Sequence, residues 1–199
     1  MEKQYNPEIA DAVRRFLDAD DWCYRFDSER GFFHFGVNLK GRMKNIQLVV
    51  CVNEHDYTVY ALSPLSADLE NPDQMCRMAE FVCRANYGLR NGNFELDFND
   101  GELRYKCFVN CKDSIPGENV IGESIHCPAV MFDRYSRGII QILFNGILAE
   151  YAIALCEEEE ETSSPEQEDS EEESSAPLIN LLRRLQDNQE EAEDDLPAD

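Results

Sequence analysis

Hydrophobic and polar positions in the first third of the chain predict one helix followed by four strands. Asn6-Pro7-Glu8 is a helix start, because asparagine caps, proline suits the first turn and glutamate suits the positive end of the helix dipole. From Trp22 the period changes to two, and short connections between strands indicate an antiparallel meander. The apolar helix face is Ile9, Val13, Phe16 and Leu17, and the strands are 22–27, 33–39, 46–52 and 57–62.

A second helix is predicted after a loop at residues 63–70. Asn71-Pro72-Asp73 repeats the pattern of the first helix start, and Gly88 is suited to the left-handed residue that ends a helix. The predicted inner face of this helix is Met75, Ala79, Val82 and Asn86.

A hairpin follows, centred on Asp100-Gly101, which predicts a two-residue type I′ turn. This turn fixes a register in which every apolar pair shares one face and two opposite-charge pairs share the other. Phe108 interrupts the polar face near its end. The apolar pairs are Phe98 with Leu103, Leu96 with Tyr105 and Phe94 with Cys107, and the charged pairs are Asp97 with Arg104 and Glu95 with Lys106.

Residues 118–156 are predicted to be mostly helical, with interruptions at Pro128, Gly138 and Gly146. The order of elements is helix, four strands, helix, two strands, helix. It predicts an α+β fold, with an antiparallel sheet of five to six strands and helices packed against its faces. The buried stripe of the last helical segment is predicted to be Met131, Tyr135, Ile139, Ile142 and Phe144.

Charge divides the 199 residues into a body and a tail. Residues 1–156 hold 16 basic and 23 acidic side chains, whereas residues 157–199 hold 2 basic and 18 acidic ones. The tail has too little apolar content to offset its ordering entropy, so it is predicted to be disordered. The acidic balance disfavours nucleic acid and anionic membranes as partners. Without a signal peptide or a spanning segment, the expected location is the cytoplasm.

One apolar island, APLINLLRRLQ, interrupts the tail near residues 177–187. It is predicted to form a short amphipathic helix that is too short to be stable alone in water. It is therefore interpreted as a docking peptide for a hydrophobic groove of the body or of a partner. The alternative interpretation is a chance helical stretch. The predicted partner-binding residues are Leu178, Ile179, Leu181, Leu182 and Leu185.

The run RANYGLRNGNFELDFNDGELRYK resembles the signature of the bacterial YbjN family. The later segment with Asp133, Tyr135, Gly138 and Ile139 is similar to the closing helix of that family. The resemblance spans about residues 5 to 147 in element order, is specific in residues only at the hairpin, and leaves the tail outside. It implies a fold similar to type III secretion chaperones, which are dimers that bind proteins without catalysis. It also implies a role in sensory transduction or chaperone-like regulation.

The candidate chemistry is sparse. His34, His55 and His126 lack the context of a catalytic motif, and no phosphate loop, nucleophile elbow or zinc-protease motif is present. The pairs Cys107/Cys111 and Cys76/Cys83 are interpreted as core packing rather than zinc ligands. Cys156 precedes five glutamates, which should make it a poor nucleophile.

The sequence thus predicts no catalytic, metal or cofactor-binding residue and no small-molecule substrate. The expected function is a non-enzymatic, homodimeric binding module for a protein partner. Two alternatives stay open: an enzyme with a cryptic Cys/His pocket, and a scaffold whose acidic tail is the active part.

Overall fold

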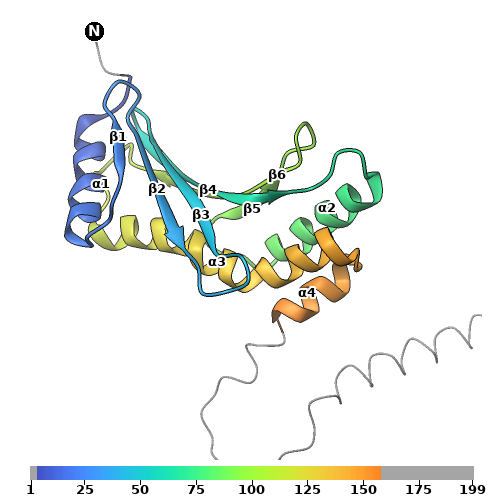
Figure 1. The fold of residues 1–199 in the computed structure, drawn as a ribbon. Helices are drawn as coiled ribbons and strands as arrows, with labels where there is room; N and C mark the ends of the chain where they lie inside the picture. Colours follow the sequence, from blue (N-terminus) through green and yellow to red (C-terminus); the bar gives the residue numbers. More distant parts are fainter. Residues whose placement is uncertain (1–3, 158–199) are drawn as a thin grey trace, which may run out of the picture. The chain divides into compact units, whose positions relative to one another are not determined.

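The computed structural model describes residues 4–157, which form an α+β unit (Figure 1). Six strands make a single antiparallel sheet in the order β1-β2-β3-β4-β6-β5, so the predicted class and the upper predicted strand number are confirmed. The elements are α1 (Pro7–Ala19), β1 (Arg25–Asp27), β2 (Phe32–Asn38), β3 (Asn45–Val52), β4 (Asp56–Ser66), α2 (Pro72–Asn86), β5 (Asn93–Leu96), β6 (Glu102–Asn110), α3 (Glu118–Asn145) and α4 (Ala149–Glu157).

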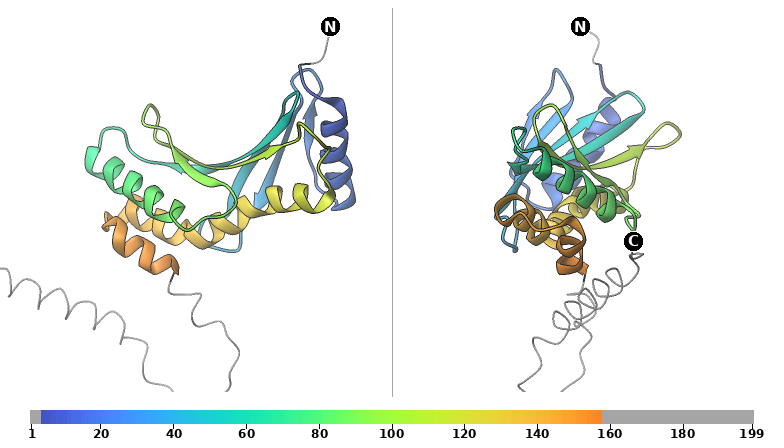
Figure 2. Two further views of the ribbon diagram at one scale, coloured as in Figure 1. Left: turned by 180° about the vertical axis from the view of Figure 1, so that it is seen from behind. Right: turned by 90° about the vertical axis from the view of Figure 1, so that its right-hand side faces the viewer.

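The helices gather on one side of the sheet, with α3 running beneath the strands and α2 and α4 beside its C-terminal half (Figure 2). The core lies between these layers. Alternate residues of β2, β3, β4 and β6 point into it, as the period of two predicted. These buried side chains include Phe33, Phe35, Ile46, Leu48, Val50, Val52, Val59, Leu103, Tyr105 and Cys107.

The first helix starts as predicted but ends in a way that shortens the first strand. The Asn6 side chain accepts a hydrogen bond from the Glu8 amide at 2.9 Å, and Ile9, Val13 and Leu17 are buried. Asp21 then takes a positive φ of 53°, and the Trp22 amide donates to the Leu17 carbonyl at 2.9 Å. This turn at the end of the helix includes Trp22, which the sequence predicted to begin the first strand. As a result, β1 begins at Arg25.

The fourth strand is longer than predicted. β4 continues to Ser66 through Ser63-Pro64, which the sequence placed in a loop. Its pairing with β6 shifts between Leu62 and Ser66. Proline lacks an amide donor, so it is tolerated in a strand at such an irregularity.

Helix α2 starts at its predicted asparagine cap, but its inner face differs from the prediction. The buried residues are Met75, Met78, Phe81 and Ala85 rather than Ala79, Val82 and Asn86, which are only partly buried. Gly88 does not take the left-handed conformation; Tyr87 caps the helix with φ of −59°. The positive φ falls instead at Gly92.

The hairpin register differs from the prediction by two residues. Phe94 lies opposite Tyr105, Glu95 opposite Arg104 and Leu96 opposite Leu103. The Asp97 amide donates to Glu102 and the Gly101 amide donates to Asp97, both at 2.9 Å, so four residues make the turn instead of two. The predicted pairs 98:103, 96:105, 94:107, 97:104 and 95:106 are therefore wrong.

The long C-terminal segment is interrupted once. Helix α3 passes without a break through Pro128 and Gly138 and ends at Gly146, which has φ of +63°. Only the break at Gly146 was predicted correctly, and α4 adds a fourth helix to the predicted order. Tyr135, Ile139 and Ile142 are buried as predicted, Met131 is partly buried, and Phe144 is exposed.

The tail from residue 158 and its leucine island lie outside the described residues. We expect a chain that ends at residue 158 to keep a single cooperative thermal transition, because it keeps every buried side chain of the described region, up to Ile153 and Cys156. Circular dichroism during heating measures this. A chain that ends at residue 148 is the control and should be less stable, because it lacks α4. Aggregation of the 158-residue chain or a gradual melt would contradict the boundary.

Candidate functional site

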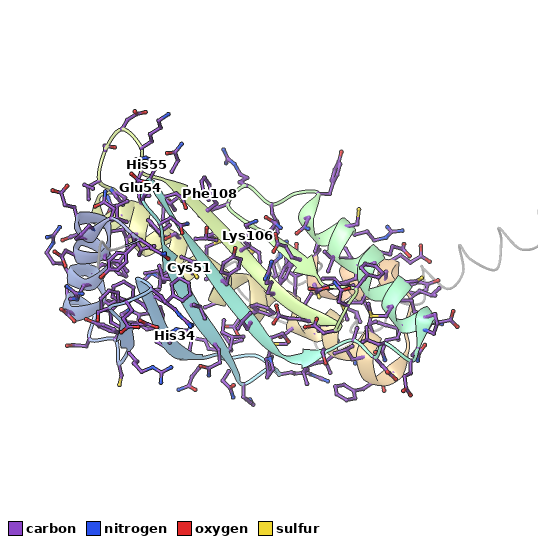
Figure 3. The ribbon with its side chains drawn as sticks, turned by 90° about the horizontal axis from the view of Figure 1, so that it is seen from above. His34, Cys51, Glu54, His55, Lys106 and Phe108 are labelled. Atoms are coloured by element: carbon purple, nitrogen blue, oxygen red, sulfur yellow. The ribbon has the colours of Figure 1, made fainter. Side chains whose placement is uncertain are left out.

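Among residues 4–157, no helix covers one face of the sheet. Figure 3 looks onto this face, and the strands lie in front of the helices. We call it the open face. Its side chains alternate with those that point into the core, so they belong to the same strands. The open face consists of Phe32, His34, Val49, Cys51, Thr58, Tyr60, Glu95, Arg104, Lys106 and Phe108.

A row of mostly apolar residues crosses four strands of the open face. Phe32 pairs with Cys51, Cys51 with Thr58, and Thr58 with Phe108. Thr58 is only 6% exposed, whereas the Phe108 side chain at the end of the row is 57% exposed. The row therefore presents the Phe108 ring to solvent beside the buried Thr58.

A second row combines aromatic and basic side chains. His34 pairs with Val49, Val49 with Tyr60, and Tyr60 with Lys106. The guanidinium of Arg104 lies 4.7 Å from the centre of the Tyr60 ring, a cation–π arrangement. Figure 3 labels Lys106 and Phe108 on the same strand of this face.

Glu95 links the two basic residues of this region. It accepts hydrogen bonds from Arg104 Nε at 2.7 Å and from Lys106 Nζ at 3.2 Å. Partial burial raises the pKa of Glu95, but the hydrogen bonds from Arg104 and Lys106 outweigh it and leave that pKa below its usual value. The carboxylate therefore holds both cations in place, and Glu102, whose Oε1 lies 3.7 Å from Arg104 Nη1, balances the second positive charge.

The three histidines lie in three separate places. His34 is on the open face, and His55 lies in the β3–β4 turn with its Nε2 3.6 Å from a Glu54 oxygen. His126 lies on α3 with its Nε2 3.4 Å from Asp20 Oδ2. The same Asp20 oxygen accepts from the Trp22 indole at 2.7 Å.

A pocket of about 430 Å³ separates the end of α1 from the start of α3. Its lining includes His126 and the carboxylates of Asp20, Glu118 and Glu123, but no cysteine. The pocket that a Cys/His enzyme would need is therefore not assembled there. In the part of the chain that the structure describes, no group of three His, Cys, Asp or Glu side chains is placed to hold a metal ion.

The cysteines are less uniformly buried than predicted. Cys107 and Cys111 are buried, in agreement with the core interpretation, but Cys76 and Cys83 are exposed on α2. The buried face of α2 explains the difference. It consists of Met75, Met78, Phe81 and Ala85 rather than the predicted residues, so Cys76 and Cys83 lie on the solvent side. Cys127 of α3 lies with its sulfur 3.3 Å from the Asn91 carbonyl oxygen and 3.8 Å from the Tyr105 hydroxyl, a position that the sequence did not indicate.

The open face was missed because helices were expected on both faces of the sheet. One signal was available: Phe108 interrupts the polar face of its strand, and it is now one of the most exposed aromatic side chains of the described region. The predicted partner-binding residues, Leu178, Ile179, Leu181, Leu182 and Leu185, lie outside the described residues, and so does any contact that they make.

The fold places the described region in the α+β class with an open antiparallel sheet. No protein-family model matches the chain, and no curated protein is significantly similar to it. The similarity of the hairpin to the YbjN family therefore stays a prediction. No helix among residues 4–157 is both long enough and apolar enough to cross a membrane.

Proposed function

We propose that this protein is a non-enzymatic protein-binding module, chaperone-like or regulatory, whose open face holds a protein partner. The observation that carries the proposal is the helix-free face with its exposed Phe108 beside the Tyr60–Arg104 pair. Aromatic residues and arginine are enriched at the energetic centres of protein interfaces. The resemblance of the hairpin to the YbjN family favours the same class of function.

The chemistry of the open face defines the partner surface that would fit it. The row from Phe32 to Phe108 favours apolar side chains, because burying them releases ordered water from both surfaces. Arg104 and Lys106 are paired with Glu95 and Glu102, so this part of the open face carries no net charge and favours polar rather than strongly charged partner groups.

The wider proposal is that the chain works as a homodimer in the cytoplasm and that its partner is a different protein. The dimer follows from the family resemblance. The eight cysteines, none of which is in a disulfide, favour a reducing compartment and so support this location.

A photo-crosslinking experiment tests the open face. Benzoylphenylalanine in place of Phe108, which is 57% exposed, is expected to yield a covalent adduct with a protein in the cells that produce this chain. The matched control carries the same probe in place of Phe98, which is 64% exposed at the hairpin turn and does not belong to the open face. Mass spectrometry identifies the adducts and separates a second copy of this chain from another protein.

The captured protein then allows a quantitative test. We expect Phe108→Ala to weaken its binding by about tenfold or more, because a bound partner would bury this exposed ring and single aromatic side chains often dominate the affinity of an interface. Phe98→Ala should leave the affinity unchanged. Equal adduct yields at both positions, or equal affinities of the two variants, would overturn the proposal that the open face is the binding surface.

A further inference from the structure

The loop between β2 and β3 carries three basic side chains. Lys40, Arg42 and Lys44 are all exposed. Within residues 4–157, no carboxylate forms an ion pair with any of these three side chains. The loop is nevertheless anchored to the body, because Leu39 and Met43 are buried. The three positive charges are therefore presented to solvent from a fixed position.

The β2–β3 loop lies directly on α3 (Figure 1). The Gly41 amide donates a hydrogen bond to Asp133 Oδ1 at 2.9 Å, and a Cβ at Gly41 would lie 3.0 Å from Ser136 Oγ. Arg134 follows Asp133 directly, and Arg137 follows it by about one helical turn. The loop and this turn of α3 thus bring basic side chains of two elements together. We call this group the basic surface, and it consists of Lys40, Arg42, Lys44, Arg134 and Arg137.

The C-terminal end of α4 lies beside the same turn of α3. The Gly138 amide donates to Cys156 Sγ at 3.3 Å, and the Tyr135 hydroxyl donates to Glu157 Oε1 at 3.4 Å. The guanidinium of Arg134 lies 5.3 Å from the centre of the Tyr135 ring. The chain that follows the described residues therefore starts next to the basic surface.

The sequence that starts there is complementary in charge. Residues 158–161 are four glutamates that directly follow Glu157. The carboxylates that the contacts place at the basic surface are Asp133 and Glu157, so five positive charges face two negative ones. Four extended residues span up to about 14 Å, and long side chains on both partners extend this reach. Because the segment is covalently joined to α4, its effective concentration at the surface is high, and individually weak ion pairs are sufficient to hold it.

We propose that residues 158–161 bind to the basic surface of their own chain and neutralise it. The surface lies where the β2–β3 loop meets α3, on the helix-covered side of the sheet, so this contact leaves the open face accessible to a protein partner. The bound glutamates compete with any other polyanion for the basic surface and so restrict which partners the body attracts. The contact is electrostatic and exposed, and it therefore weakens as the salt concentration rises.

Zero-length cross-linking of the full protein tests the contact. A carbodiimide joins a lysine amine to a carboxylate that touches it, with the loss of one water. After digestion and mass spectrometry, we expect peptides that link Lys40 or Lys44 to residues 158–161. Lys112, which is exposed after β6, is the internal control and should not be linked to that segment. The yield should fall at least about threefold in about 1 M sodium chloride, where the screening length is about 3 Å.

Two isotopes and two variants complete the test. An equal mixture of ¹⁴N and ¹⁵N protein separates links within one chain from links between chains. The rate at which an activated acetyl ester modifies Lys40 reports how well its amine is shielded. E158Q/E159Q/E160Q should raise this rate about threefold, which corresponds to the loss of an exposed ion pair. E171Q/E172Q/E173Q removes the same charge farther along the tail and should leave the rate unchanged.

Three results would overturn the proposal. The first is a set of linked peptides in which Lys112 is joined to residues 158–161 as often as Lys40 and Lys44 are, or in which no lysine is joined to them. The second is linkage that occurs only between chains. The third is an equal acetylation rate of Lys40 in the two variants.

Discussion

Replacing Gly138 by leucine is expected to destabilise the protein by at least about 3 kcal/mol, because the position has no room for a side chain. A Cβ at Gly138 would lie 2.5 Å from Phe81 Cε2, 2.7 Å from the Ala152 carbonyl oxygen and 2.9 Å from Cys156 Sγ. Helices α2, α3 and α4 meet at this point, so the leucine forces them apart. Urea unfolding followed by circular dichroism measures the change in the free energy of unfolding.

Gly88→Leu is the control for this change. No atom lies within 4 Å of a Cβ at Gly88, and the expected change in the free energy of unfolding is within about 0.5 kcal/mol. If Gly138→Leu is as stable as Gly88→Leu, the close approach of α3 and α4 is wrong.

The second large effect is expected for Phe94→Ala, which should cost about 3–5 kcal/mol. Phe94 is 2% exposed, and its ring meets three other aromatic rings edge to face. The centroid distances are 4.8 Å to Tyr105, 5.3 Å to Phe132 and 5.5 Å to Tyr135. Truncation removes all three contacts and leaves a cavity between β5 and α3. Chemical denaturation again provides the measurement.

Phe98→Ala distinguishes the observed register from the predicted one. With the four-residue turn, Phe98 is 64% exposed and its truncation should change the free energy of unfolding by no more than about 0.5 kcal/mol. With a two-residue turn, Phe98 would pack against Leu103, and both variants would be strongly destabilised. A large loss at Phe98 would therefore contradict the hairpin described here.

The hairpin illustrates what a period of two can and cannot determine. A shift of two residues leaves the side chains of the paired residues on their predicted faces, so alternation alone could not detect the error. The decisive interaction is local: Asp97 Oδ1 accepts hydrogen bonds from the Asn99 amide and from the Asn99 side chain, both at 2.8 Å. This Asx turn competes with the two-residue turn that Asp100-Gly101 favours.

Helix α3 shows how packing overrides a local signal. A proline ring conflicts with the carbonyl four residues earlier, here that of Ser124, so Pro128 predicted an interruption. The helix nevertheless continues, because Ile125 and Phe132 on either side are completely buried. Ser124 is also fixed by hydrogen bonds to the Ile121 carbonyl at 2.8 Å and to the Tyr57 hydroxyl at 2.9 Å.

The helix starts and the strand patterns were predictable because they depend on neighbours in the sequence. The candidate site was not, since it depends on where the helices lie and on contacts between distant elements. Whether a sheet face is covered cannot be deduced from its alternation. The contact between Tyr105 and Cys127 likewise joins a strand to a helix across an intervening loop, and no spacing rule predicts it.

Helix α3 contacts α1, α2, α4, β4 and β6. These elements come from both the N-terminal and the C-terminal parts of the described unit. Neither part can therefore unfold without exposing some of α3 to solvent. Its central amides should therefore exchange with deuterium only through opening of the whole unit, at the slowest rate in the described region. Any ligand that binds the native state raises that opening free energy. Deuterium uptake in the middle of α3 would then report occupancy of the open face, although no residue of α3 touches it.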